Sequence, residues 1–306
     1  MVMNFVSAIT TYTDLFYQVH CLWNHALNEN SPKALSEINR MLDRVFDKIV
    51  IEQGPGEFYR ARIVSPKDYD KIQLKSKIVL DSEESGIKGF CSDEMGPPPC
   101  EYVEDGRANK PKTSFLYLAS DRATACSEVQ PICGDFISVA PFELLQTVQV
   151  ADLRNIPDDL SRFTSNDNLE QLIDMVFASV LVDFFSVPVK QKNAKEMYKY
   201  SQYASDYLRK KGVSGLMYNS SHNSNPGSYN LVLFNPSTAK CMVEYAEMIT
   251  CLSVAASFQN ISENVYGDDV AEIMTAKKEI PEYNWASTAV LQRDLLKLKK
   301  KACDHT

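Results

Sequence analysis

Several basic side chains lie where an anionic ligand could use them. Arg60 and Arg62 are two residues apart in a stretch that alternates large apolar and basic residues, and Arg107 lies in a polar stretch with Lys110 and Lys112 nearby. The planar guanidinium fork suits phosphate oxygens, and residues two apart on a strand share one face. The pattern allows an anion site, although a solvated surface charge also explains any one of these residues taken alone.

One carboxylate and one phenol lie among apolar neighbours. Glu128 is flanked by Ala125, Cys126 and Val129, and burying a carboxylate is unfavourable unless it is paired or used. Glu128 is therefore either a catalytic carboxylate or an exposed helical glutamate. Tyr117 lies inside an apolar strand, where a core tyrosine with a satisfied hydroxyl is the alternative to a functional one.

Polar residues also gather just after a predicted strand near residue 218. Ser220 and Ser221 lie at its end, where loops commonly carry functional groups. Serine is equally common as a turn former. The two serines are thus candidates for ligand contact or simple turn residues.

The elements that would position these residues can be predicted from apolar spacing. Apolar residues recur at intervals of three and four through 35–49, which predicts a helix starting near Ser31-Pro32, and a second helix is expected from Phe5 to His25. Gly54-Pro55-Gly56 is a breaker cluster and marks a boundary. The first 53 residues are therefore expected to form a helical extension.

The middle of the chain alternates strands and helices. Strands are expected at 58–64, 115–119, 136–139, 147–153, 215–218 and 230–234, and helices at 123–129, 169–182 and 197–211, with Asp121 at the start of the first. Residues 65–112 are polar and rich in proline, which indicates a long loop. The residues after 240 are expected to be helical, so the predicted division is 1–53, 54–240 and 241–306.

Composition excludes several classes of protein. The 306 residues carry a formal net charge of -8, opposite in sign to a broad nucleic-acid footprint, although a local arginine cluster can still bind a small anion. No apolar run reaches the length of a membrane span, and the start lacks the features of a signal peptide. The eight cysteines fit no common zinc spacing. We therefore expect a cytoplasmic protein with reduced thiols, no metal, no membrane contact and no nucleic-acid partner.

Short motifs recur in one order along the chain. They are Phe58-Tyr59-Arg60-Ala61-Arg62, Met95-Gly96-Pro97-Pro98, Gly106-Arg107-Ala108-Asn109, Leu116-Tyr117-Leu118-Ala119, Thr124-Ala125-Cys126-Ser127-Glu128-Val129, Ser201-Gln202-Tyr203, Tyr218-Asn219-Ser220-Ser221 and Asn230-Leu231-Val232-Leu233-Phe234. This order resembles the RES domain, in the variant with a helical N-terminal extension. The resemblance covers roughly residues 55–236. Gln130 stands where that variant often has Arg, and Lys112 stands near a common Gly.

The resemblance implies a fold and an activity. The fold would be α+β, with an ADP-ribosyltransferase-like mixed sheet and helical segments at both ends. RES domains are toxins that consume NAD, so the activity would be cleavage of the nicotinamide–ribose bond by phosphorolysis or hydrolysis. NAD would be a substrate, with inorganic phosphate as a possible co-substrate and no required cofactor.

The resemblance also implies which residues act. The motif positions carry over to four catalytic residues, Arg107, Tyr117, Glu128 and Ser220. Arg60, Arg62, Ser221 and Asn230 would add substrate contacts. Glu128 would stabilise positive charge on the ribose, and Arg107 would hold the pyrophosphate or an attacking phosphate.

Two other functions remain open on the sequence. The same pocket would serve transfer of ADP-ribose to a protein, or it would bind a nucleotide without turnover. An enzyme that consumes NAD would harm its own cell, so an inhibitory antitoxin or another regulatory protein is an expected partner. Oligomerisation is also possible.

Overall fold

The structure is a computed structural model that describes residues 5–70, 72, 88–154, 169–189, 193–223, 225 and 227–254. All of these belong to one compact unit, Met1–Val254. The predicted helical stretch at 255–306 lies outside the described residues. None of the helices in the described part is long and apolar enough to cross a membrane.

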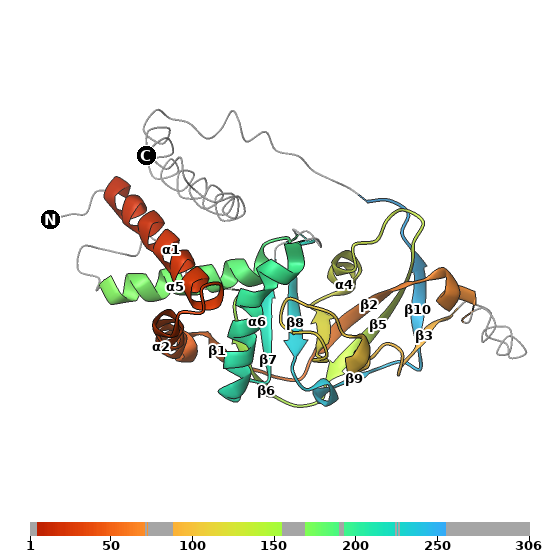
Figure 1. The fold of residues 1–306 in the computed structure, drawn as a ribbon. Coiled ribbons are helices and arrows are strands. Elements are labelled where there is room, and N and C mark those ends of the chain that lie inside the picture. Colours follow the sequence, from red (N-terminus) through yellow and green to blue (C-terminus); the bar gives the residue numbers. More distant parts are fainter. Residues whose placement is uncertain are drawn as a thin grey trace, which may run out of the picture. The chain divides into compact units, whose positions relative to one another are not determined.

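Two helices form a hairpin at the N-terminal end. They are α1 (Phe5–Leu27) and α2 (Pro32–Ile49), as the sequence predicted (Figure 1). Ser31 is the N-cap of α2, and its hydroxyl accepts a hydrogen bond from the Ala34 amide. The apolar residues of α2 at spacings of three and four are buried, which explains why this segment folds as an amphipathic helix.

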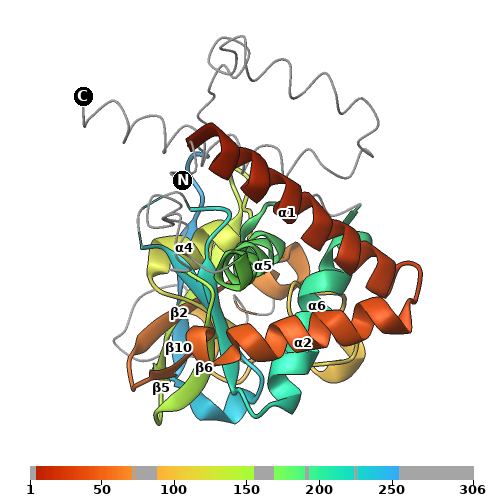
Figure 2. The ribbon, with the colours of Figure 1, turned by 90° about the vertical axis from the view of Figure 1, so that its left-hand side faces the viewer.

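Two further helices, α5 (Leu169–Ser186) and α6 (Ala194–Lys210), pack against this hairpin (Figure 2). Trp23 of α1 is completely buried at their meeting point. Its indole makes ring contacts with four aromatic side chains of α5 and α6, namely Phe177, Phe184, Tyr200 and Tyr203. Burial of these large rings holds α1 against α5 and α6.

A mixed sheet forms the other half of the unit. In sheet order its strands are β1 (Val50–Gln53), β6 (Val148–Asp152), β7 (Gly215–Asn219), β8 (Tyr229–Leu233), β4 (Leu116–Ala119), β2 (Glu57–Val64), β5 (Phe136–Leu144), β10 (Tyr245–Thr250) and β3 (Lys88–Cys91), while β9 (Ala239–Cys241) pairs with β5. β6 and β7 are parallel, and the other pairs are antiparallel. The predicted α+β class with a mixed sheet is confirmed.

Three local predictions were wrong. Val50–Gln53, inside the predicted helical extension of residues 1–53, is a strand that pairs with β6. The sequence predicted helix after residue 240, but Tyr245–Thr250 is a strand. It is extended because it pairs with β5 and β3 on its two sides. Lys88–Cys91 is a strand inside the stretch predicted as loop, and it is held by β10. All three strands depend on partners far away in the sequence rather than on their own patterns. The division of the chain at residues 53 and 240 stays a prediction.

The sheet opens between β2 and β4. These strands pair at one position only, Tyr59 with Ala119, whereas β2 pairs with β5 over its whole length and β4 with β8 over its whole length. The short helix α4 (Arg122–Glu128) packs against β2, β5 and β4 beside this opening. The opening and α4 together create the space in which the candidate site lies.

Candidate active site

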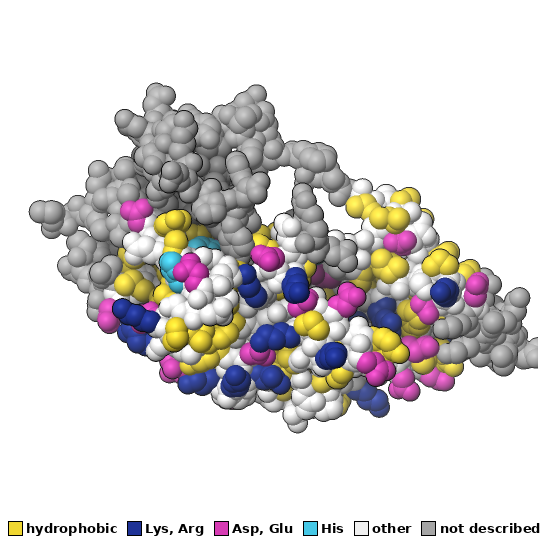
Figure 3. Space-filling view, viewed as in Figure 1, with side chains coloured by type: hydrophobic (Ala, Val, Ile, Leu, Met, Phe, Trp, Pro, Cys, Tyr) yellow, Lys and Arg dark blue, Asp and Glu magenta, His cyan; other side chains and the backbone are white. Residues whose placement is uncertain are grey.

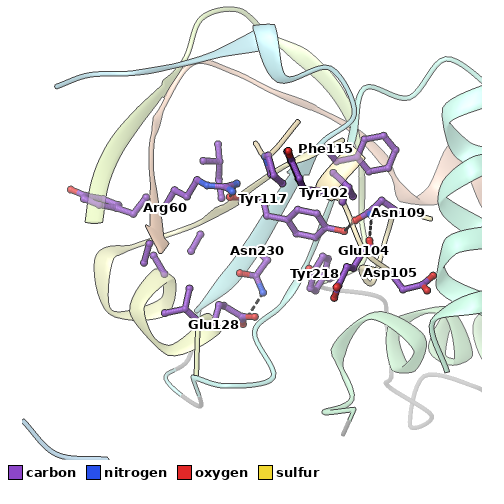
Figure 4. Close-up of a pocket in the computed structure, with 18 residues that line it drawn as sticks. Arg60, Tyr102, Glu104, Asp105, Asn109, Phe115, Tyr117, Glu128, Tyr218 and Asn230 are labelled. Carbon is purple, nitrogen blue, oxygen red and sulfur yellow. Dashed lines mark hydrogen bonds between the residues drawn. The ribbon is translucent and has the colours of Figure 1, made fainter. Parts of the chain in front are cut away.

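A cavity of about 500 Å³ lies where β2 and β4 separate (Figure 4). Eighteen residues line it, among them Arg60, Tyr117, Glu128 and Asn230 from the predicted set. Three alanines also face it, Ala61, Ala119 and Ala125. Their small side chains leave the space that larger residues would fill, and the volume is typical of a small-molecule site.

The register of the sheet brings residues from distant segments into one row. Tyr218 of β7 pairs with Asn230 of β8, which pairs with Ala119 of β4. Residues paired in this way project to the same face of a sheet. The motifs near 117, 218 and 230 therefore meet at the cavity because of strand register.

Glu128 is the last residue of α4, and its carboxylate is held from one side. The Ser220 hydroxyl donates a hydrogen bond of 2.5 Å to Oε1, and the Asn230 side-chain amide donates one of 2.9 Å to the same oxygen. Asp121 caps the helix start by accepting bonds from the amide and hydroxyl of Thr124. These contacts fix the carboxylate at the cavity wall (Figure 4).

Ser220 lies at the turn after β7 and does not itself line the cavity. Its hydroxyl oxygen accepts hydrogen bonds from the amides of His222 at 3.2 Å and Asn223 at 3.0 Å, so its proton is directed to Glu128. Ser220 thus shapes the turn and orients the carboxylate. The neighbouring Ser221 is not part of the lining either.

The Tyr117 hydroxyl both donates and accepts a hydrogen bond within the protein. It donates to Oδ1 of Asn109 at 2.7 Å and accepts from the Ala108 amide at 3.0 Å. Burial raises the pKa of Tyr117 well above its usual value, and the charge of Arg107 opposes this only in part. The phenol is therefore neutral at physiological pH and presents its ring to the cavity.

Arg60 is a half-buried cation that faces the cavity, and none of the described residues places a carboxylate against it. Its guanidinium donates to the main-chain oxygen of Tyr117 at 3.2 Å, at the place where β2 no longer pairs with β4. Its Nε is buried and has no hydrogen-bond partner among the described residues. Burial lowers the pKa of Arg60 to about 10, and the nearby charge of Arg62 adds to the effect. An anion in the cavity would satisfy the Nε donor and would also stabilise the charge of the guanidinium.

Arg107 has a different position from the one predicted for an anion contact. Its guanidinium donates to the main-chain oxygens of Phe184 at 3.3 Å and Val187 at 2.9 Å, at the C-terminal end of α5, and it is 9% exposed. It lies over the Tyr198 ring and is not among the lining residues. A cation at this place offsets the negative end of the helix dipole.

The loop that carries Arg107 is fastened by α6. Ser201 donates to the main-chain oxygen of Arg107, and the Gln202 amide donates to the main-chain oxygens of Gly106 and Asn109. Tyr203, the next residue, donates to the side chain of Asn39 in α2. The Ser201-Gln202-Tyr203 motif thus connects the loop beside the cavity to the N-terminal helices.

Arg62 lies outside the lining although it shares a face of β2 with Arg60. Its guanidinium lies over the Phe90 ring at 4.8 Å and donates to the main-chain oxygen of Glu94. The structure adds lining residues that the sequence did not single out, namely Tyr59, Tyr102, Asp105, Asn109 and Tyr218. Tyr59, Asn109 and Tyr218 lie inside the recognised motifs, and this was the signal that could have identified them.

Two departures from the family pattern are visible in the backbone. Lys112 has a φ of 66° and Gln130 a φ of 51°, both in the left-handed region that favours glycine. The left-handed backbone at Lys112 explains why glycine is common near this position in the family. The Gln130 side chain lies 3.2 Å from the His222 ring beside the Glu128 turn. No cluster of three or more metal-ligating side chains occurs within the described part of the chain.

Comparison with known proteins shows the family of the chain. A model described as the RES domain matches residues 89–251, which is more than half of the chain. Among curated proteins no match is found. One similar solved structure is the MbcT–MbcA toxin–antitoxin complex of M. tuberculosis, at 11% sequence identity and a TM-score of 0.35, covering 69% of this chain and 91% of that one. At this TM-score the similarity adds nothing to the description of the site.

Proposed function

Because the chain belongs to the RES domain family, we propose that it cleaves NAD at the nicotinamide–ribose bond, by phosphorolysis or hydrolysis. The observation that carries the proposal is the carboxylate of Glu128, held by Ser220 and Asn230 at the wall of the cavity.

Glu128 would stabilise the charge that develops during cleavage. Breaking the bond to nicotinamide builds positive charge on the ribose, as in other glycosyl transfers with an oxocarbenium-like transition state. The two hydrogen bonds that the described residues make to the Glu128 carboxylate both reach Oε1, so that, among these residues, Oε2 would be left to face the reacting sugar or the incoming nucleophile. A carboxylate held in advance contributes without reorganising as charge develops.

Arg60 would hold the anionic part of the substrate. Its side chain lines the cavity, and its Nε is buried with no hydrogen-bond partner among the described residues. The pyrophosphate of NAD would satisfy it, and so would an inorganic phosphate nucleophile in phosphorolysis. We therefore propose Arg60, rather than Arg107, as the anion contact.

Arg107, Tyr117 and Ser220 would act mainly by positioning. Arg107 joins the end of α5 to the loop beside the cavity, and Tyr117 fixes that loop through Asn109 and Ala108. Ser220 orients Glu128. Losing any of the three would lower the rate by displacing the groups that touch the substrate.

The proposal includes a regulator. An enzyme that consumes NAD would deplete the cell that makes it, so we propose that a partner protein, acting as an antitoxin does, restrains this one. The partner would be detected as a protein that co-purifies with the chain and suppresses its NAD consumption.

The test is NAD loss by the purified chain, with and without inorganic phosphate, with products resolved by mass. Phosphate-dependent formation of ADP-ribose 1-phosphate would establish phosphorolysis, and free ADP-ribose without phosphate would establish hydrolysis. Radiolabel from NAD retained on protein would mean ADP-ribosyl transfer instead. NAD binding without any product would contradict the proposal and favour a nucleotide-binding module.

A further inference from the structure

Tyr102 is an aromatic side chain exposed at the cavity. It lines the cavity and is 73% exposed, the highest exposure of any large aromatic residue in the described part of the chain. Its side chain makes no hydrogen bond, ion pair or ring contact with the described residues. An exposed ring at the edge of a pocket leaves apolar surface in water that a flat ligand could cover.

The backbone that carries Tyr102 is fixed. Tyr102 ends a single 3-10 turn, η1 (Cys100–Tyr102), in which its amide donates to the main-chain oxygen of Pro99 at 3.0 Å. Three consecutive prolines precede this turn, and each has a restricted φ. The Pro98 main-chain oxygen is held by the Ser114 hydroxyl at 2.7 Å. The ring is thus presented from a rigid support, which lowers the entropy lost on binding a ligand.

Charge is unevenly distributed along the cavity. Tyr102 and Glu128 lie apart in the cavity, and Glu104 and Asp105, which follow Tyr102 closely in the chain, also line its wall (Figure 4). The Asp105 carboxylate is held by the Gln202 amide at 3.0 Å. Two carboxylates repel phosphate but accept hydrogen bonds from an exocyclic amino group. Arg60, whose Nε has no hydrogen-bond partner among the described residues, is the cation suited to phosphate.

We propose that Tyr102 forms a base subsite, in which its ring stacks on the adenine of the substrate. This inference rests on the proposed function, because Glu128 must then face the ribose at the nicotinamide end. The pyrophosphate would lie toward Arg60 and the adenine toward Tyr102, Glu104 and Asp105. The subsite would raise affinity for dinucleotides over substrates that lack the adenylate part.

The experiment is a calorimetric titration with ADP, which carries the base and the pyrophosphate but cannot be cleaved at a nicotinamide bond. Tyr102→Ala is expected to weaken ADP binding about tenfold, as removal of a base-stacking aromatic commonly does. Tyr102→Phe keeps the ring and should bind ADP as the wild type does. Tyr17→Ala removes a partly exposed tyrosine of α1, outside the cavity lining, and serves as the control.

Ribose 5-phosphate, which lacks a base, is the second probe. Its binding should be equal in the wild type and in Tyr102→Ala. Equal ADP affinity in all variants, no ADP binding to the wild type, or an equal loss for both probes would overturn the subsite. Tyr102-dependent ADP binding without NAD cleavage would refute the proposed activity alone, whereas NAD cleavage with ADP binding indifferent to Tyr102 would refute the subsite alone.

Discussion

Arg60 is a residue whose surroundings disfavour its charge. The side chain is half-buried with its Nε fully buried, burial lowers its pKa to about 10, and among the described residues its guanidinium makes one hydrogen bond, to the main-chain oxygen of Tyr117. Because no carboxylate among these residues pairs with it, the charge disfavours folding, and a bound anion would offset this effect. Arg60 therefore links ligand binding to stability.

Replacing Arg60 by Met tests this link. We expect Arg60→Met to change the free energy of unfolding by less than about 1 kcal/mol, because loss of the buried charge offsets loss of one hydrogen bond. Phosphate should raise the Tm of the wild type and leave that of Arg60→Met unchanged. Arg62→Met, outside the cavity lining, is the control and should keep the phosphate effect. An equal rise of Tm in Arg60→Met would exclude Arg60 as the anion contact.

The loop from Glu104 to Lys110 is an element whose shape depends on one glycine. A Cβ at Gly106 would overlap Oδ1 of Asn109 and lie 2.8 Å from the Tyr117 hydroxyl, both part of the network that fixes the loop. The Gln202 amide holds the main-chain oxygen of the same glycine. Gly106 is therefore required for close packing, without any need for a left-handed backbone.

Gly106→Ala is expected to disturb stability and activity together. Overpacking at such a site costs roughly 1–3 kcal/mol, and displacement of Tyr117 should lower kcat/KM for NAD. Gly54→Ala is the matched control, since nothing lies within 4 Å of its added Cβ. Urea denaturation measures the free energy of unfolding of both variants, and NAD kinetics measure their kcat/KM. Wild-type behaviour of Gly106→Ala would show that the loop does not need this packing.

Packing between α1 and α5 includes a histidine that is held neutral. His20 lies 4.8 Å from the Phe16 ring and 5.5 Å from the Phe184 ring, and its Nε2 is buried without a partner among the described residues. Burial lowers the pKa of His20 to about 4. The ordinary pKa of a histidine is 6.5, so between pH 6.5 and 4 the unfolded state binds a proton that the folded state does not. The neutral His20 therefore contributes fully to stability above pH 6.5, and this contribution is lost as the pH falls toward 4.

The free energy of unfolding should fall by about 3 kcal/mol between pH 6.5 and 4 because of His20. His20→Phe removes the titrating group and keeps an aromatic ring, so its stability should depend less on pH over this interval. His25→Gln, which removes an exposed histidine of the same helix, is the control. Chemical denaturation across this pH range measures the difference. Parallel profiles for the wild type and His20→Phe would mean that His20 does not titrate as its burial implies.

Elements with a strong pattern of their own could be predicted from the sequence. The buried stripe of α2, its Ser31 cap and the Asp121 cap of α4 are set by local spacing and side-chain chemistry, and they are confirmed. Strands β3 and β10 were missed because pairing between distant segments creates them. The site motifs were found by family resemblance, but the positions of Arg60 and Arg107 required the sheet opening and the end of α5, which no local pattern encodes.

At the scale of the whole unit, the N-terminal helices and the sheet form one structure. Trp23 of α1 is buried among aromatic rings of α5 and α6, and α6 in turn fastens the loop beside the cavity. Strand β1, at the end of α2, pairs with β6 at the edge of the sheet. We infer that the N-terminal helices support the site.

Trp23→Ala is expected to destabilise the whole unit by about 3–5 kcal/mol, as removal of a large buried side chain does. Urea unfolding followed by circular dichroism should still show a single transition, shifted to lower urea. A smaller shift is expected for Trp23→Phe, which keeps an aromatic ring. If Trp23→Ala instead melted α1 in a separate early transition and left NAD turnover intact, the helices would be an independent extension.

The central claim is that Glu128 is the catalytic carboxylate of an NAD-cleaving site. The most direct measurement compares kcat for NAD in the wild type and in Glu128→Gln, which keeps an oxygen for Ser220 and Asn230 but removes the charge. The account predicts a fall in kcat on the order of 10²–10³-fold with little change in Tm or NAD affinity. Turnover by Glu128→Gln near that of the wild type would contradict it.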